Sequence, residues 1–247
     1  MASPTTAPTP AKRVLLCGTN YGRTYVRAIG RSDGRYTLAG ILARGSLDST
    51  LLAAQLGVPY FTRAGDVQGN IDLACAAMGP RGDDVVLALL QRGIAVLCEH
   101  PVQAELVERA WSTGTPFDVN GHFARLDDPR AFIAAAQKRA RPERVHAAID
   151  PRLLYASLDI MRHAFGTLAL PITWETNERQ CRIVAAYEHE TLELPHIDLD
   201  QDKRDAATLE AMDTVGQTPK EHLLDVSRAT EEVARRWFSG ARAEAGR

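Results

Sequence analysis

The chain has 247 residues, of which 45% are hydrophobic and 24% charged, and its formal net charge is −2. This composition supports a buried core in one large domain or two small ones and argues against global disorder. The balanced charge indicates neither a nucleic-acid nor a membrane-surface partner, and no apolar run reaches the length of a membrane span.

The first twelve residues (MASPTTAPTPAK) lack the apolar segment that a secretory signal needs. We therefore predict a flexible tail over residues 1–12 and a cytoplasmic protein. Four widely spaced cysteines without a C-x-x-C pair are typical of free thiols in a reducing compartment, and they predict no metal site. These cysteines are Cys17, Cys75, Cys98 and Cys181.

From residue 13 to residue 123, short apolar runs alternate with segments of helical periodicity. This alternation predicts βαβ units and a doubly wound parallel sheet, that is, a Rossmann domain over 13–123. The predicted strands are 13–17, 36–43, 58–61, 71–78, 94–98 and 117–123. The predicted helices are 21–29, 48–56, 83–91 and 102–112.

After residue 123 the alternation stops, and we predict a smaller α+β domain over 124–247. The fold class is therefore α/β, with an N-terminal Rossmann sheet followed by this second domain. The charged run D-L-D-Q-D-K at 198–203 lacks the glycine and the terminal glutamate of a calcium loop, so we interpret it as a solvated surface. The predicted helices are 129–140, 153–165, a segment around 209–212 and 219–238. The predicted strands are 172–176, 181–188 and 191–194.

A glycine-containing turn follows the first predicted strand, where dinucleotide-binding folds carry G-x-G-x-x-G. Here Gly18 is present, Asn20 and Arg23 replace the second and third glycines, and Gly22 comes one residue early. Gly18 favours a tight turn, Gly22 lets the helix start close to the sheet, and Asn20 can donate a hydrogen bond to phosphate. The hypothesis is a phosphate-binding loop; the alternative is an ordinary strand–helix turn.

The second predicted strand ends in Arg44, Gly45 and Ser46, where NAD sites place a carboxylate for the ribose hydroxyls. An arginine there would pair with the 2′-phosphate of NADP, and Ser46 could donate a hydrogen bond to it. The sequence thus favours NADP(H). In the alternative interpretation, Arg44 is only a solvated loop cation.

Glu99, His100 and Pro101 follow the fifth predicted strand, at the carboxyl edge of the sheet where ligands bind in such folds. Histidine titrates near neutral pH and can give up a proton as a hydride arrives. The alternative is a capping pair before the next helix.

Together, G-T-N-Y-G at 18–22, R-G-S at 44–46, E-H-P at 99–101 and V-N-G-H-F at 119–123 resemble the Gfo/Idh/MocA oxidoreductases. That superfamily usually has E-K-P in place of E-H-P. The change of lysine to histidine and the GTNYG turn are most similar to the thiazolinyl imine reductases of siderophore assembly lines. The resemblance implies an NADPH-dependent enzyme that reduces a thiazoline to a thiazolidine on a carrier domain of a nonribosomal peptide synthetase.

The resemblance also implies roles for particular residues. His100 would be the general acid that protonates the ring nitrogen, with Glu99 beside it in the catalytic site, and no metal would take part. The residues expected to bind the cofactor are Gly18, Thr19, Asn20, Tyr21 and Gly22 at the pyrophosphate, Arg44, Gly45 and Ser46 at the 2′-phosphate, and Glu99, His100 and Asn120 at the nicotinamide.

The chain departs from that family in two respects. Phe123 stands where a tyrosine proton donor is expected, and whether His122 or Tyr155 replaces it stays open; strand geometry predicts that His122 and Phe123 point to opposite faces. The second domain is also shorter than in the family, which leaves activity and a sheet-mediated homodimer open. Asp159 stands where family members often have a carboxylate near the substrate. The alternatives are a sugar or polyol dehydrogenase and a non-catalytic NADP-binding partner of a synthetase.

Overall fold

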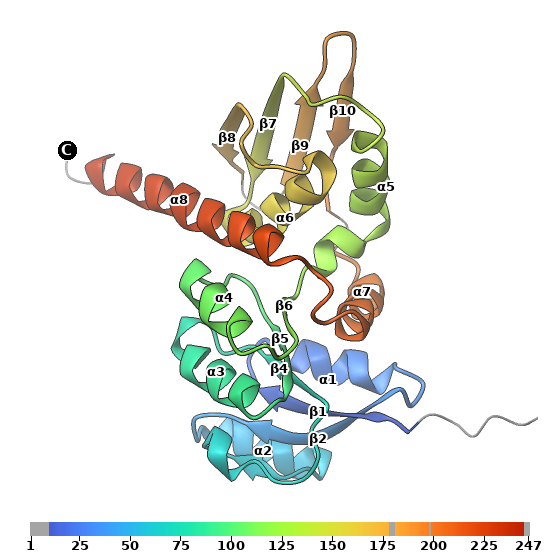
Figure 1. The fold of residues 1–247 in the computed structure, drawn as a ribbon, viewed down its shortest axis with the longest axis vertical. Coiled ribbons are helices and arrows are strands. Elements are labelled where there is room, and N and C mark those ends of the chain that lie inside the picture. Colours follow the sequence, from blue (N-terminus) through green and yellow to red (C-terminus); the bar gives the residue numbers. More distant parts are fainter. Residues whose placement is uncertain (1–9, 178–180, 198, 245–247) are drawn as a thin grey trace, which may run out of the picture.

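The computed structural model describes residues 10–177, 181–197 and 199–244. Figure 1 shows two sheets, one in each half of the molecule, with the long C-terminal helix crossing between them. The first sheet has six strands in the order β3-β2-β1-β4-β5-β6, and all of its recorded pairings are parallel. The predicted Rossmann topology is therefore confirmed.

The elements of this half follow the predicted alternation closely. β1 begins at Lys12, the last residue of the predicted tail, and residues 1–9 of that tail lie outside the described residues. The strands are β1 (Lys12–Cys17), β2 (Tyr36–Leu42), β3 (Tyr60–Phe61), β4 (Leu73–Ala76), β5 (Ala95–Cys98) and β6 (Phe117–Val119). The helices are α1 (Arg23–Gly30), α2 (Leu47–Leu56), α3 (Asp83–Gln91) and α4 (Ala104–Trp111).

The central strands are apolar because helices cover both faces of the sheet. The last four residues of β1 and all four of β4 are buried, and they contribute to two hydrophobic clusters, one on each face. The four cysteines are free and buried, and burial raises the pKa of the Cys17 thiol to about 12. They act as small apolar core residues.

The second half contains a four-stranded mixed sheet in the order β10-β9-β7-β8. Its central strand β7 (Arg144–Ile149) was not predicted, because its short run RVHAAI lies between two strong helical patterns. The other strands are β8 (Ile172–Thr176), β9 (Cys181–Ala186) and β10 (Thr191–Leu194). The helices are α5 (Asp127–Ala136), α6 (Leu154–Phe165), α7 (Gln201–Asp213) and α8 (Lys220–Glu244).

Residue 198 of the run 198–203 lies outside the described residues, and Leu199, Asp200, Asp202 and Lys203 are exposed, as predicted for a solvated surface. Residues 201–203 form the start of α7, which is capped by the Asp200 side chain and lies beside α1 of the Rossmann domain (Figure 1). Asp205 is buried there and forms an ion pair with Arg27 at 2.9 Å. The face of α7 that carries Leu209 and Met212 joins the hydrophobic cluster of α1 and β1.

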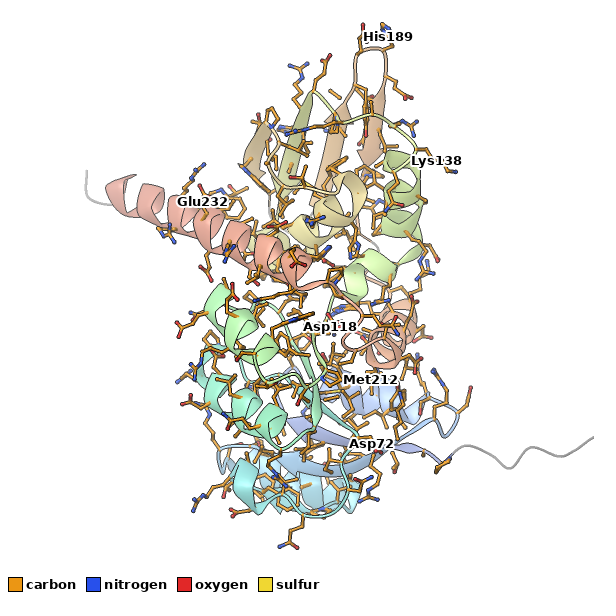
Figure 2. The ribbon with its side chains drawn as sticks, in the orientation of Figure 1. Asp72, Asp118, Lys138, His189, Met212 and Glu232 are labelled. Atoms are coloured by element: carbon orange, nitrogen blue, oxygen red, sulfur yellow. The ribbon has the colours of Figure 1, made fainter. Side chains whose placement is uncertain are left out.

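A buried carboxylate holds the loop between α7 and α8. Asp118 of β6 accepts hydrogen bonds from the backbone N–H of Gly216 at 3.2 Å and of Thr218 at 3.3 Å. Figure 2 shows Asp118 at the junction of the two halves, with Met212 nearby on α7. The C-terminal part is therefore tied to the carboxyl edge of the first sheet, where the candidate site lies. None of the helices in the described part of the chain is long and apolar enough to span a membrane.

Candidate functional site

The loop between β1 and α1 has the backbone geometry that close approach to a phosphate requires. Gly18 has φ +85°, and a Cβ there would lie 2.6 Å from the Ala77 carbonyl oxygen. A Cβ on Gly22 would lie only 2.1 Å from the carbonyl oxygen of Gly18. Both positions therefore require glycine, and α1 begins directly afterwards, with its free N–H groups at the loop.

A chain of hydroxyl groups joins this loop to the end of β2. The Thr19 Oγ1 atom lies 2.6 Å from Ser49 Oγ, which lies 2.7 Å from Ser46 Oγ. Ser46 also caps α2 by accepting a hydrogen bond from the Ser49 backbone N–H. Ser49 was not predicted, because nothing in the sequence distinguishes it from other helical serines. The loop and these hydroxyls enclose a cavity of about 350 Å³, which is lined by Gly18, Thr19, Asn20, Ala43, Arg44, Ser46, Asp48, Ser49, Ala77 and Met78.

Arg44 lies at the mouth of this cavity and is exposed. No hydrogen bond or ion pair to another described residue holds its guanidinium, so it can contact a bound anion. Gly45 has φ +90° and donates its backbone N–H to the Tyr60 hydroxyl at 2.8 Å. Asp48 also lines the cavity.

At the carboxyl end of β5, Glu99 is buried at 8% exposure and held by two donors. Its Oε2 atom accepts hydrogen bonds from the Tyr25 hydroxyl at 2.7 Å and from Asn120 Nδ2 at 3.0 Å. Burial raises the pKa of the Glu99 carboxyl, while His100 and these two hydrogen bonds oppose the shift. Its other oxygen, Oε1, lies 3.5 Å from His100 Nε2. The structure thus brings together Glu99, His100 and Asn120, as predicted, and adds Tyr25.

Three aromatic residues surround the His100 imidazole. The Tyr155 ring stacks on it with centroids 5.2 Å apart and planes at 4°, and the His122 and Phe123 rings lie 6.1 and 5.9 Å away. The expectation that His122 and Phe123 point to opposite faces of a strand is wrong. β6 ends at Val119, and both residues lie in a 3-10 turn with ring centroids 4.1 Å apart.

Beside His100 lies a second cavity of about 410 Å³, lined mainly by apolar and ring side chains. Arg204 of α7 belongs to it and was not predicted, because nothing in the sequence distinguishes it from other surface cations. Its Nη2 donates to the Tyr21 hydroxyl at 2.8 Å, and its guanidinium lies 5.3 Å from the Phe123 ring centroid. The lining residues are Tyr21, His100, Phe123, Asp150, Arg152, Leu153, Leu199 and Arg204.

His122 should make the protein sensitive to acid. Its ring is buried at 1% exposure, and burial, followed by the charges of His100 and Arg204, holds its pKa well below 6.5. The unfolded chain therefore binds one more proton than the folded chain below about pH 6.5, and stability falls as the pH falls, by at most about 1.4 kcal/mol per pH unit from this group. We expect His122→Phe to flatten this dependence in urea unfolding measured on both sides of pH 6.5.

The control for this experiment is His189→Phe, since the His189 side chain is 85% exposed. In this variant the free energy of unfolding should depend on pH as it does in the wild type. An equal loss of stability at acid pH in the His122→Phe variant and the wild type would contradict the assignment.

A parallel sheet with a glycine-restricted loop at a helix start, and with titratable residues at the carboxyl edge, defines a dinucleotide-binding domain. Residues 12–114 match the model of the Gfo/Idh/MocA family, described as "Oxidoreductase family, NAD-binding Rossmann fold". The N-terminal domain is therefore similar to the NAD-binding Rossmann domain of that oxidoreductase family. No curated protein sequence gives a significant match to the chain.

Solved structures share the whole fold at low sequence identity. One is GenD2 from gentamicin A biosynthesis in complex with NAD, with a TM-score of 0.75 and 11% identity over 94% of this chain and 95% of that chain. Another is biliverdin reductase from Synechocystis sp. PCC 6803 in complex with biliverdin and NADP⁺ (0.66, 13%, 92% and 99%). A third is scyllo-inositol dehydrogenase from Lactobacillus casei (0.70, 12%, 90% and 95%). At these identities the likeness establishes the fold alone.

Proposed function

We propose that this chain is an NADPH-dependent imine reductase that converts a thiazoline to a thiazolidine on a carrier domain of a nonribosomal peptide synthetase. The observation that carries the proposal is the environment of His100. This histidine occupies the place where the family usually has lysine, lies beside a buried carboxylate and lines a largely apolar cavity. A ring of modest polarity fits such a cavity better than a polyol does.

The residues of the first cavity fit a dinucleotide. Gly18 and Gly22 have no Cβ atoms, so the backbone of the loop stays accessible to a pyrophosphate. Asn20 is exposed beside it, and Thr19, Ser46 and Ser49 contribute hydroxyls. When bound, the nicotinamide supplies the hydride that reduces the C=N carbon.

The chain itself supplies the proton. In the proposed reaction the His100 imidazolium keeps its Nε2 proton toward Glu99 Oε1 and donates the Nδ1 proton to the imine nitrogen, which makes the C=N carbon a better hydride acceptor. Tyr25 and Asn120 fix the orientation of the Glu99 carboxylate through Oε2. A proton from solvent then restores the imidazolium. Nε2 and Oε1 lie 3.5 Å apart, and catalytic hydrogen bonds often reach their final length only in the complex with substrate.

The Tyr155 ring stacks on His100 with centroids 5.2 Å apart, while the His122 and Phe123 rings lie farther away, at 6.1 and 5.9 Å. Tyr155 is buried at 3% exposure, and burial followed by the Asp159 charge raises its pKa well above 10. The same burial keeps His122 neutral. We therefore assign the proton transfer to His100 alone, with Tyr155 as the residue that orients its ring.

NADPH is the proposed cofactor because Arg44 is exposed at the cavity mouth, next to the Ser46 hydroxyl. Replacing Arg44 by alanine should weaken NADPH binding by about 10–100-fold, the loss expected for a charge-assisted contact of about 1.5–3 kcal/mol. NADH binding should change little, since NADH has no 2′-phosphate. Fluorescence titration of both cofactors measures this, with Arg81→Ala, a substitution of another exposed arginine, as the control. Equal weakening for the two cofactors would contradict the role of Arg44.

A second candidate function is a sugar or polyol dehydrogenase. It is favoured by the solved structures with this fold, which include inositol and UDP-sugar dehydrogenases. The histidine at position 100 and the largely apolar cavity beside it argue for the imine instead.

The test combines NADPH titration with turnover assays. Consumption of NADPH with a synthetic thiazoline, and faster consumption when the thiazoline is attached to a carrier domain, supports the proposal. Reduction of NADP⁺ by polyols would support the second candidate. Tight NADPH binding without turnover of any thiazoline would make the chain a non-catalytic partner of a synthetase.

A further inference from the structure

The cavity beside His100 contains a guanidinium that has no ion-pair partner in the described part of the chain. Arg204 of α7 is half-buried and lines this cavity. Its Nη2 atom donates a hydrogen bond to the Tyr21 hydroxyl at 2.8 Å, whereas its Nε atom is buried without a partner among the described residues. Because a guanidinium has five N–H donors, these residues satisfy only part of the hydrogen-bonding capacity of Arg204.

Two other half-buried arginines of the second domain each contact a carboxylate. Arg125 lies 3.0 Å from Glu210, and Arg162 lies 2.9 Å from Asp225. Burial of a charge costs free energy unless an opposite charge or hydrogen bonds compensate it. Arg204 has no such carboxylate among the residues that the structure describes, and a bound anion would take its place.

The other charges that line the cavity balance one another. Both carboxylate oxygens of Asp150 accept hydrogen bonds from the Arg152 side chain. In the proposed reaction the His100 imidazolium lies beside the Glu99 carboxylate, so these two charges also cancel. Arg204 then gives the cavity a net positive charge, which favours an anionic ligand.

We propose that Arg204 is a specificity-determining residue that binds an anionic oxygen group of the substrate, a carboxylate or a phosphate. This inference deepens the proposed function and rests on it, since it takes the His100 cavity as the substrate site. A planar guanidinium pairs with either group through two parallel hydrogen bonds. The Tyr21 hydroxyl accepts from Arg204 and can donate its own proton to the same group.

Phe123 lies between this positive charge and the proton donor. Its ring centroid is 5.3 Å from the Arg204 guanidinium and 5.9 Å from the His100 ring centroid. A substrate with an apolar ring and an anionic group away from its C=N bond matches this arrangement. Arg204 is not among the residues that line the phosphate cavity, which favours the substrate over the dinucleotide as the source of the anion.

The first experiment measures binding, so its result does not depend on turnover. Isothermal titration calorimetry of the NADPH-loaded full chain compares two matched pairs of aromatic thiazoles, which lack the reducible C=N bond of a thiazoline. One pair is thiazole carboxylate and thiazole carboxamide. The other pair is the thiazole thioester of phosphopantetheine and that of pantetheine, which differ by the phosphate alone.

The wild type should bind the charged member of one pair about 10–100-fold more tightly, as expected for a charge-assisted contact. The pair that shows the preference identifies the anion as a carboxylate on the ring or as the phosphate of the carrier arm. Arg204→Gln should lose the preference. Arg204→Lys keeps the charge without the planar fork and should retain part of it.

Lys203→Gln is the matched control, because it removes the next charge along α7, on a side chain that is 49% exposed. This variant should keep the preference, and circular dichroism checks that all variants are folded. Equal affinity within both pairs in the wild type would overturn the inference, as would a preference that survives in Arg204→Gln. Equal weakening of NADPH and NADH binding in Arg204→Gln would also overturn it, because the anion would then belong to the dinucleotide.

Turnover separates this inference from the proposed function. Reduction of thiazolines with no preference for a charged member would overturn the role of Arg204 alone. A preference that depends on Arg204, without reduction of any thiazoline, would overturn the proposed reaction and leave the anion site in place.

Discussion

Replacing His100 by alanine should reduce kcat for thiazoline reduction by about 10²–10⁴-fold, the usual contribution of a positioned general acid. The reason is that the imine nitrogen loses the only proton donor that the proposal places beside it. NADPH affinity should change by less than about threefold, because His100 lines the substrate cavity and not the phosphate cavity. Steady-state kinetics and NADPH titration on the same preparations measure both quantities.

Two matched variants sharpen this test. Glu99→Gln keeps an oxygen that can accept hydrogen bonds from Tyr25 and Asn120, but it removes the negative charge beside His100. We therefore expect kcat to fall less than in His100→Ala and the pH profile of kcat to shift. Tyr155→Phe keeps the ring that stacks on His100 and should retain most of the activity. An unchanged kcat in His100→Ala would show that His100 is not the general acid. A large loss of kcat in Tyr155→Phe would instead assign proton donation to Tyr155.

Replacing Gly22 by alanine should weaken NADPH binding by about 10–100-fold and lower the free energy of unfolding by about 1–3 kcal/mol, as for other overpacked sites. The new Cβ would lie 2.1 Å from the Gly18 carbonyl oxygen and 3.0 Å from Leu16 Cδ1. Backbone cannot move aside as a flexible side chain can, so the loop must shift away from the phosphate position. Cofactor titration and urea unfolding measure the two effects.

Gly30→Ala is the matched control at the other end of α1. A Cβ there meets no atom within 4 Å, so cofactor binding should not change and helix stability should rise by up to about 1 kcal/mol. Wild-type NADPH affinity in Gly22→Ala would contradict the interpretation of residues 18–22 as a phosphate loop.

The Rossmann half could be predicted because its pattern is local. Strands buried on both faces are continuous apolar runs, and the intervening helices have their own periodicity, so the presence and order of the strands follow from the sequence. The ends were less exact, since β4 and β6 end before the predicted residues. The carboxyl ends of parallel strands share one edge of the sheet, so the order of the strands is enough to place Gly18 and Glu99 in one region. Tyr25, which holds Glu99, was not predicted because its periodicity resembles that of a core residue.

The second half depends on contacts between distant segments, and prediction failed there. β7 contains only two large apolar residues in RVHAAI, and the strands on either side make it a central strand. α7 has charged residues along most of its length, and its position against α1 follows from the Arg27–Asp205 pair. Arg204 reaches the His100 cavity only through this packing, so its position in the sequence carries no signal.

The most direct test of the central claim is a reaction of the full chain with NADPH that carries deuterium at its transferable position, with a synthetic thiazoline as acceptor. We expect that NADPH is consumed and that mass spectrometry finds one deuterium on the carbon of the former C=N bond, with the rate strongly reduced in His100→Ala. Unlabelled thiazoline recovered intact, while the same preparation reduces NADP⁺ with a polyol, would contradict it.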